Sequence, residues 1–255
     1  MPLDLVTIPC RQDNYAYLIH DPQSGATALI DAPEAAPILA ALSVRGWQLG
    51  QIFITHHHTD HVEGVAELRA ATGAQVSGAA ADAHRLPPLD RALVPGDSVT
   101  VGAESGSVLD MPGHTIGHIA FHFAAAQLLF TADSLMALGC GRLFEGTAEQ
   151  MWRALGTLDA LPDATLVCSG HEYTQSNARF ALSIEPGNTA LHARAARIAE
   201  ARAKDMPTVP SLLGLERATN PFLRAHLPHV KSSLGLPNAS DVESFAELRQ
   251  RKDRF

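Results

Sequence analysis

The sequence predicts an α/β protein, built as a sandwich of two β-sheets flanked by helices and followed by a smaller all-α domain. Up to residue 171, short apolar runs rich in β-branched residues alternate with segments of helical periodicity, as in layered α/β folds. Residues 1–78 and 98–168 repeat a similar order of strands and helices, which indicates two sheets. After His171 the pattern is helical, with no convincing strand. We therefore expect one α/β domain over 1–171, followed by a smaller helical domain over 172–255.

The first part of the chain is expected to contain strands and two helices. Strand spacing occurs in residues 3–8, 15–20, 26–31, 51–55 and 75–77, and helical spacing in residues 34–44 and 62–71. The segment Asp21-Pro22-Gln23-Ser24-Gly25 has the composition of a hairpin turn. Residues 79–97 contain Pro87-Pro88 and Pro95-Gly96, so we expect a surface connection there.

The next part is rich in β-strand patterns, and helices follow it. Strands are expected over 98–101, 107–111, 118–123, 127–131 and 165–168, and helices over 148–158, 173–182, 189–204 and 240–252. Two of these helices begin with a capping box, in which an N-cap hydroxyl and the third helical residue exchange hydrogen bonds. These boxes are Thr147 with Gln150 and Ser240 with Glu243.

The composition describes a globular protein without a membrane span. No apolar run approaches the roughly 20 residues needed to cross a bilayer, and Met1-Pro2-Leu3-Asp4 lacks the pattern of a signal peptide. Cys10, Cys140 and Cys168 are odd in number and widely spaced, which does not describe a disulfide framework and fits a reducing compartment. We expect a cytoplasmic monomer that does not bind membranes.

The charge distribution argues against nucleic acid as a partner. The formal net charge is -8, whereas non-specific nucleic-acid binding depends on basic surface. One stretch reverses the sign, because Arg249-Gln250-Arg251-Lys252-Asp253-Arg254 contains four basic residues and one acid. This stretch is either a binding site for an anionic ligand or a helix end that favours cations near its C-terminus.

The chemistry of the chain is concentrated in Thr55-His56-His57-His58-Thr59-Asp60-His61, which places four imidazoles and a carboxylate within six positions. The cluster follows an apolar strand and precedes a helix, and such strand ends carry ligand sites in α/β proteins. His56 and His58 alternate along an extended segment, so they point the same way and His57 faces the other side. Asp60 and His61 then turn toward a neighbouring position.

Three further potential ligands each follow a strand-like run. They are His114 in Pro112-Gly113-His114-Thr115, Asp133 in Thr131-Ala132-Asp133-Ser134, and His171 in Ser169-Gly170-His171. Imidazole and carboxylate donors without thiolate suit Zn, Fe or Mn. Together with the ligands at 56–61, these residues are too many for one tetrahedral ion. They fit two ions, with one carboxylate bridging them at roughly 3.5–4 Å.

These residues resemble the metallo-β-lactamase superfamily, which shares the Thr-His-x-His-x-Asp-His signature at 55–61, the Pro-Gly-His-Thr loop, the aspartate and the last histidine. The resemblance covers 1–171 and implies an αββα sandwich. Further segments resemble the hydroxyacylglutathione hydrolases, or glyoxalase II enzymes, and extend the likeness to nearly the full chain. These segments are 139–147, 170–174, 185–188 and Arg249-x-x-Lys252-Asp253.

The resemblance implies a role for each ligand. The first metal is matched by His56, His58 and His114, the second by Asp60, His61 and His171, and the bridge by Asp133. It also implies glutathione binding by Arg142, Tyr173, Arg249 and Lys252. The family has Lys and Tyr where this chain has Arg142 and Phe144, so the hydrogen-bond geometry of the first changes and the hydroxyl of the second is lost. The ligands and the family resemblance make the domain over 1–171 a metal-binding catalytic domain and the domain over 172–255 a substrate-binding domain.

The implied activity is hydrolysis of the thioester of S-D-lactoylglutathione to glutathione and D-lactate, a step of methylglyoxal detoxification. Two divalent ions per chain, with Zn favoured over Fe or Mn, would lower the pKa of a bridging water from about 15.7 toward 7 and produce the attacking hydroxide. Asp60 is the candidate to take its proton. Glutathione thiolate is a good leaving group, because a thiol pKa lies around 8.5.

Other classes share the metal loop and remain alternatives. A glutathione persulfide dioxygenase uses a single iron, and a lactonase or lactamase uses a similar dinuclear centre. The basic C-terminal segment favours the glutathione thioesterase over both. A non-catalytic metal-binding protein is a further alternative, and it would show no turnover in an assay of glutathione thioester hydrolysis.

Residues around the ligands have weaker signals. Asp31 ends an apolar strand and is a candidate to brace the 55–61 loop from behind. His57 and His118 are expected to be structural, with a supporting contact to a ligand as the alternative. The other histidines are expected on the surface or in the core.

Overall fold

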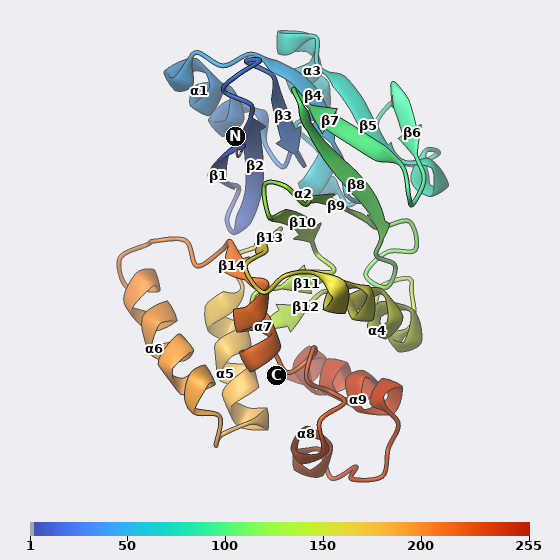
Figure 1. Cartoon of the computed structure of the whole chain (residues 1–255), viewed down its shortest axis with the longest axis vertical. Helices are drawn as coiled ribbons and strands as arrows, with labels where there is room; N and C mark the ends of the chain where they lie inside the picture. Colours follow the sequence, from blue (N-terminus) through green and yellow to red (C-terminus); the bar gives the residue numbers. More distant parts are fainter. Residues whose placement is uncertain (1–2) are drawn as a thin grey trace. The chain divides into compact units, whose positions relative to one another are not determined.

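The computed structural model describes residues 3–255 (Figure 1), so the predicted lack of a leader at Met1 and Pro2 lies partly outside the described residues. The chain divides into two compact units. The first comprises the residues up to Met111 together with Gly117–Ala132, and the second comprises Pro112–Ile116 and Asp133–Phe255.

The first unit contains a mixed sheet of six strands. In sheet order they are β1 (Asp4–Cys10), β2 (Asn14–His20), β3 (Thr27–Ile30), β4 (Leu49–Phe53), β5 (Gln75–Ala79) and β6 (Arg91–Leu93). The first two pairings are antiparallel and those from β3 to β6 are parallel. Ile30 pairs with Phe53, and Phe53 with Ser77, so the carboxyl ends of three neighbouring strands lie at one edge. The residues that follow these strands are therefore brought together.

Helices α1 (Ala35–Arg45), α2 (Thr59–Val62) and α3 (Val65–Thr72) belong to this unit, as does the 3₁₀ turn η1 (Ala80–Asp82). The apolar side of α1 buries Ile38 and Leu42 against Leu29 and Ile52 of the sheet, in one core cluster. Helix α1 ends at Gly46, whose positive φ of 66° is the left-handed conformation that glycine adopts at little cost.

A second, antiparallel set of strands completes this unit. It consists of β7 (Ser98–Val101), β8 (Glu104–Asp110), β9 (Ile119–Phe123) and β10 (Leu128–Ala132), each paired with the next. Aromatic rings join the two sheets, because Phe53 stacks on Phe121 at 5.3 Å between centroids and Tyr17 lies 5.7 Å from Phe130. The sandwich predicted from the sequence is therefore present.

The second unit is mainly helical. Its elements are β11 (Leu135–Met136), β12 (Gly139–Cys140), α4 (Ala148–Gly156), η2 (Thr157–Ala160), β13 (Leu166–Ser169), α5 (Thr174–Ile184), α6 (Thr189–Arg202), β14 (Ser211–Leu212), α7 (Leu213–Thr219), α8 (Pro228–Ser233) and α9 (Asp241–Arg254). Both predicted capping boxes form, at the starts of α4 and α9. The pair β11–β12 is a tight hairpin, and β13 pairs antiparallel with β14.

The structure contains short elements that the sequence analysis did not anticipate. Strand β6 lies inside the expected connection 79–97, and β14 lies after His171, where no strand was expected. The hairpin β11–β12 and helices α7 and α8 were also not predicted. These elements span two to seven residues, which is too short for a period of 2 or 3.6 to be recognised.

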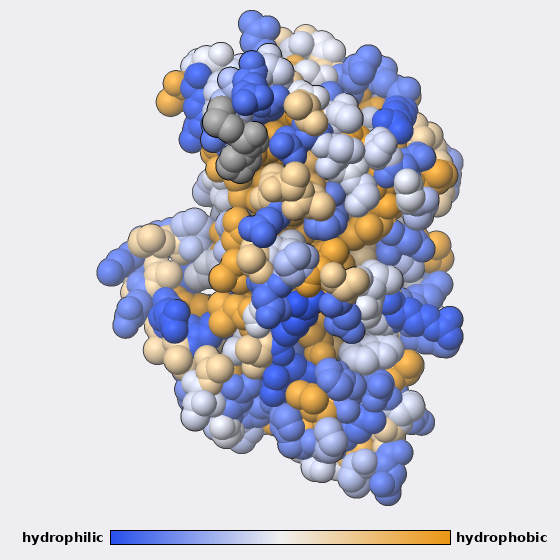
Figure 2. Space-filling view, in the orientation of Figure 1, coloured by the Kyte–Doolittle hydropathy of each residue, from blue (hydrophilic) through white to orange (hydrophobic). Residues whose placement is uncertain are grey.

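Among residues 3–255, no helix is both long enough and apolar enough to cross a membrane. Hydrophilic side chains make up much of the outer surface seen in Figure 2, with hydrophobic ones interspersed. Most large apolar side chains are instead buried in the cores. The cytoplasmic location and the monomeric state stay predictions.

Candidate metal centre

In the first unit, the loop after β4 is held from behind by Asp31, the residue that follows β3. Asp31 Oδ1 accepts the backbone N–H of Thr55 at 2.8 Å, and Asp31 Oδ2 lies 2.8 Å from both the Thr55 hydroxyl and His61 Nδ1. Asp31 has a positive φ of 55°, a conformation that is uncommon for residues other than glycine. The brace that the sequence analysis assigned to Asp31 is confirmed.

The imidazoles of this loop lie close together in the interior. His56 Nε2 is 3.1 Å from His58 Nδ1, and the rings of His56 and His61 are 4.1 Å apart between centroids. His56 and His61 are fully buried. His118 stacks on His56 at 4.8 Å between ring centroids and an interplanar angle of 19°. This is the supporting contact to a ligand that was the alternative interpretation of His118. Two ring nitrogens that face each other at this distance can share a cation.

His57 contacts a different partner from His56 and His58, as the alternation along the loop predicts. Its Nδ1 lies 3.4 Å from Asp82 Oδ2, and Asp82 is 2% exposed. Asp82 also accepts hydrogen bonds from Arg85. His57 therefore contacts η1, whereas Asp31 contacts Thr55 and His61.

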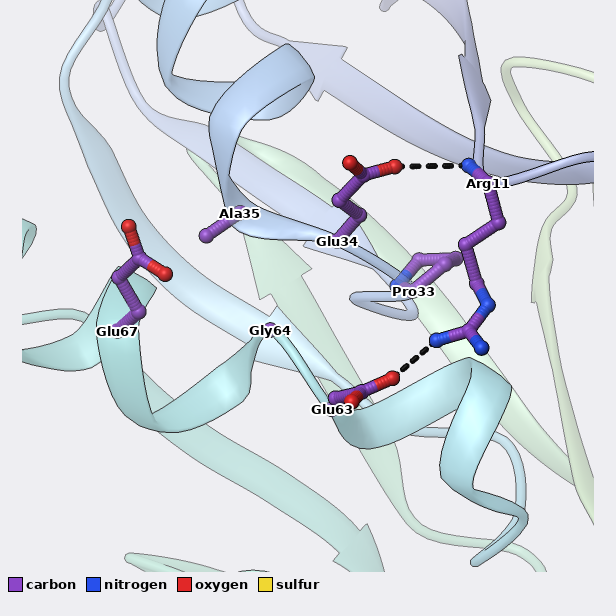
Figure 3. A pocket seen from close by; sticks show the side chains of 7 residues that line it. All are labelled: Arg11, Pro33, Glu34, Ala35, Glu63, Gly64 and Glu67. Carbon is purple, nitrogen blue, oxygen red and sulfur yellow. Dashed lines mark hydrogen bonds and ion pairs between the residues drawn. The ribbon is translucent and has the colours of Figure 1, made fainter.

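Asp60 is held by Asn14, the first residue of β2, which the sequence analysis did not single out. The Asn14 amide donates to Asp60 Oδ2 at 3.0 Å and to the Asp60 carbonyl at 3.1 Å. Asn14 is 4% exposed, so water does not compete freely for these bonds. The preceding turn is fastened by Arg11, whose backbone N–H donates to Glu34 and whose guanidinium pairs with Glu63 (Figure 3). The signal for Asn14 in the sequence was a polar residue at the start of a fully buried strand.

In the second unit, Asp133 lies between two imidazoles. Its Oδ2 is 3.4 Å from His114 Nε2 and 3.3 Å from His171 Nε2. All three side chains are buried, with at most 5% of each residue exposed. His114 Nδ1 lies 2.9 Å from the carbonyl oxygen of Arg142, which can only accept a hydrogen bond. His114 therefore donates from Nδ1, and its Nε2 atom faces Asp133.

This arrangement requires a glycine next to it. A Cβ atom on Gly141 would lie 2.0 Å from the Asp133 carbonyl oxygen and 2.8 Å from His114 Nδ1. Neither neighbour can move without displacing a proposed ligand. Gly141 therefore lets the chain after the hairpin β11–β12 pass close to the Asp133 backbone and the His114 ring.

The hairpin that follows Asp133 is fixed by buried polar residues of the helices. Glu216 accepts the backbone N–H of Leu138 at 2.8 Å, and it pairs with Arg194. Asn177 donates to the Ala137 carbonyl, and Asn220 donates to the carbonyls of Met136 and Gly139. Glu216 is fully buried. These contacts hold Leu138 at a φ of 57° and so define where Gly141 and Arg142 emerge.

Two of the predicted glutathione-binding residues lie on α9. Arg249 is 5% exposed, donates to the Cys140 carbonyl at 2.7 Å, and pairs with Asp253 at 2.9 Å. Lys252 Nζ is 3.1 Å from Ser176 Oγ and lies over the rings of Phe180 and Phe255. Burial, reinforced by Arg249, Arg179 and Arg142, lowers the pKa of Lys252 to about 8.

The remaining predicted substrate residues are more exposed. Tyr173 is 39% exposed, and its ring stacks on His171 at 4.6 Å and 6°. Arg142 lies 3.8 Å from Asp253, with most of its side chain exposed. Phe144 is 61% exposed and meets the His114 ring edge-on at 5.3 Å. The second unit thus presents cations and aromatic rings around His114 and His171. Their role in binding substrate stays a prediction.

The cysteines do not supply a nucleophile. All three are buried and unpaired with one another. Burial raises the pKa of Cys140 to about 11 and that of Cys10 to about 12, and it also holds the pKa of Cys168 well above the usual value of a thiol. Since the thiolate is the reactive form, these side chains act as small apolar fillers.

Comparison with known proteins identifies the family. The model of the metallo-beta-lactamase superfamily matches residues 12–171, and that of the hydroxyacylglutathione hydrolase C-terminus matches residues 172–255. A hydroxyacylglutathione hydrolase from Cereibacter sphaeroides is 63% identical over 255 residues, which is 100% of both chains. This chain belongs to the hydroxyacylglutathione hydrolase family of the metallo-β-lactamase superfamily. The predicted family is therefore confirmed.

Similar solved structures support the fold class. ETHE1 from Myxococcus xanthus is 24% identical, with a TM-score of 0.67 over 98% of this chain and 90% of that one. The TTHA1623 protein, solved in a di-iron-bound form, is 26% identical, with a TM-score of 0.63 over 86% of this chain and 99% of that one. The predicted α/β fold with a helical C-terminal region is confirmed. The family and its His/Asp clusters support binding of divalent metal.

Proposed function

We propose that this chain hydrolyses the thioester of S-D-lactoylglutathione to glutathione and D-lactate, using two divalent ions. Its membership of the hydroxyacylglutathione hydrolase family makes it a hydrolase, and the full-length likeness to enzymes of that name carries the choice of substrate. The alternative of a persulfide dioxygenase is not favoured, because the curated relatives that match the whole chain are named as hydrolases.

The residues present fit a pair of divalent ions. We assign the first ion to His56, His58 and His114, the second to Asp60, His61 and His171, and the bridging position to Asp133. The donor set is imidazole and carboxylate, which accepts Zn, Fe or Mn. The pair His56 Nε2 and His58 Nδ1, and the contacts of Asp133 with two Nε2 atoms, place donor atoms toward each other rather than toward solvent. When bound, such ions lower the pKa of water and polarise a carbonyl.

The side chains of the protein supply the other parts of catalysis. The cations of Arg142, Arg249 and Lys252 would bind the carboxylates of glutathione, because charge-assisted hydrogen bonds to carboxylate are the strong ones. Tyr173 and Phe144 would flank the reacting thioester, since their rings contact His171 and His114. The attacking water gives its proton to Asp60, whose orientation is fixed by Asn14. The thiolate departs without a strong acid, as a thiol pKa lies around 8.5.

Metal analysis paired with turnover of S-D-lactoylglutathione tests this proposal. The Arg249→Ala/Lys252→Ala double variant should retain two metal ions per chain and raise KM at least about tenfold, because each lost charged hydrogen bond contributes about 1.5–3 kcal/mol. Arg251→Ala is the matched control on the same helix, since Arg251 pairs with Glu247 and should leave KM unchanged. Because Arg249 is buried, melting of each variant and the single Lys252→Ala change separate binding from folding. One metal ion with oxygen consumption, or no turnover by the wild type, would contradict the proposal.

A further inference from the structure

Asp31 contacts one proposed ligand directly and is linked to a second through Thr55. Its Oδ2 lies 2.8 Å from His61 Nδ1 directly, and it reaches His56 through Thr55, whose hydroxyl lies 2.8 Å from Oδ2 and 3.0 Å from His56 Nδ1. Asp31 is 3% exposed, and Thr55, His56 and His61 are fully buried. Water therefore has little access to these contacts.

The direction of each hydrogen bond follows from the donor inventory. An ionised carboxylate only accepts, so the single hydroxyl proton of Thr55 is donated to Asp31. The Thr55 oxygen then accepts a proton from His56 Nδ1, and Asp31 accepts the proton of His61 Nδ1. A neutral imidazole carries one proton, so Nε2 of both His56 and His61 holds a lone pair.

We propose that Asp31 is a positioning residue that selects Nε2 as the donor atom of both His56 and His61, and so fixes one ligand of each metal ion. The inference rests on the dinuclear centre proposed above. The fold places Asp31 for this task, because β3 and β4 run parallel and Asp31 leaves β3 beside the loop after β4. Its backbone N–H is also bound, by the Phe53 carbonyl at 3.0 Å.

Asp31→Asn is the sharpest test, because it preserves shape and reverses the donors. The N–H of Thr55 still needs an acceptor, so the amide oxygen takes the place of Oδ1 and the NH₂ group takes that of Oδ2. The NH₂ group donates to the Thr55 hydroxyl and to His61 Nδ1, and the hydroxyl then donates to His56 Nδ1. Both rings move their proton to Nε2, where it blocks the metal. If Asp31 only braced the loop, its replacement by Asn would not change the tautomers of His56 and His61.

Two further variants test the supports of the two proposed metal sites separately. Thr55→Val removes the link to His56 and keeps that to His61, so only the first ion should be weakened. Asn14→Ala releases Asp60, so only the second ion should be weakened, with no change of tautomer. Circular dichroism of each metal-free protein would show whether it is folded. If Asp31→Asn does not fold, Thr55→Val and Asn14→Ala still test the proposal.

The first measurement is imidazole ¹⁵N NMR of the metal-free protein. We expect protonated Nδ1 at His56 and His61 in the wild type and protonated Nε2 at both in Asp31→Asn. The second is titration with Zn²⁺ alone, with ¹¹³Cd NMR to resolve the two sites. Loss of a partner of a ligating histidine typically costs about 10- to 100-fold in metal affinity, and Asp31→Asn should cost this at both sites.

The outcomes distinguish the inference from the function on which it rests. Wild-type tautomers and wild-type affinity in Asp31→Asn would overturn the inference, as would equal weakening of both sites by Thr55→Val. If the wild type binds fewer than two ions while the NMR tautomers are as expected, the dinuclear proposal fails and the selection of Nε2 by Asp31 stands.

Discussion

The two units build their shares of the proposed metal centre in different ways. In the first unit, the ligands come from one loop, His56 to His61, and their supports come from neighbouring strands of one sheet. In the second unit, His114, Asp133 and His171 come from three separate loops and meet around one carboxylate oxygen. The contiguous part is held by strand ends, and the dispersed part depends on buried polar contacts with helices. We therefore expect the two parts to respond differently to substitution.

The largest effect is expected from Asp133→Ala, which removes the proposed bridge. Because metal ions contribute several kcal/mol of transition-state stabilisation, turnover should fall by roughly 10³ or more, and both ions should be lost. His58→Ala should weaken only the first ion, and the exposed Asp159→Ala is a neutral control. The comparison fails if Asp133→Ala retains two ions and full turnover.

A large effect on stability is expected from Glu216→Gln in the second unit. The variant leaves the buried Arg194 cation without its carboxylate, which should lower the free energy of unfolding by about 3–5 kcal/mol. The exposed pair Arg153–Glu149 provides the matched control, since Glu149→Gln should cost about 1 kcal/mol or less. Urea unfolding of both variants measures the difference. Equal costs would show that the hairpin β11–β12 does not depend on this network.

A smaller, pH-dependent effect is expected at Lys252. Its pKa is lowered from 10.5 to about 8, so the ammonium group that would bind substrate is lost as pH rises through 8. In the wild type, kcat/KM should decline above this pH, whereas Lys252→Arg should remain charged and lose the decline. Lys231→Arg, outside the proposed site, serves as control. A profile unaltered by Lys252→Arg would remove Lys252 from substrate binding.

The same shift predicts the sign of a stability change. Between pH 8 and 10.5 the unfolded chain binds the proton of Lys252 and the folded chain does not. The free energy of unfolding should therefore gain a contribution that rises with pH across this window. Lys252→Met should lack that rise, and chemical unfolding at several pH values would detect it.

The smallest effect is expected from Phe144→Tyr, which adds the hydroxyl that the family resemblance implies at this position. One added hydrogen bond contributes about 0.5–1.5 kcal/mol, so KM should fall about two- to tenfold with kcat unchanged. Phe144 is 61% exposed, so melting should not change. Phe144→Leu, without a hydroxyl, should show no gain. An unaltered KM in Phe144→Tyr would place the ring outside reach of glutathione.

The contrast between the two parts also explains what could be predicted from the sequence. The loop at 55–61 follows a buried strand and holds its four proposed ligands within six positions, so local pattern is sufficient to find it. His114, Asp133 and His171 were each visible only as a polar residue after a strand, and the family resemblance joined them. The long helices and their capping boxes were predicted because they extend over several turns.

The supports of the ligands were mostly not predictable. Glu216 occurs in a sequence that is typical of an exposed helix, and its burial depends on Arg194, which lies 22 positions earlier. Asn14 is of a residue type that is common in turns, and its contact with Asp60 spans 46 positions of the sequence. Asp31 was found because it ends an apolar strand, which is a local signal. Contacts of this kind are set by the fold and leave no periodic trace.

The antiparallel pair β13–β14 has a practical consequence for dividing this protein. Strand β13 leads directly into His171, and its hydrogen-bonding partner, Ser211–Leu212, belongs to the matched C-terminal family segment. A chain shortened at residue 171 would leave one edge of that strand without Ser211 and Leu212, and unpaired strand edges promote self-association. The helical segment should therefore be expressed together with the proposed metal ligands, and separate production of the two parts is expected to yield aggregates rather than a minimal enzyme.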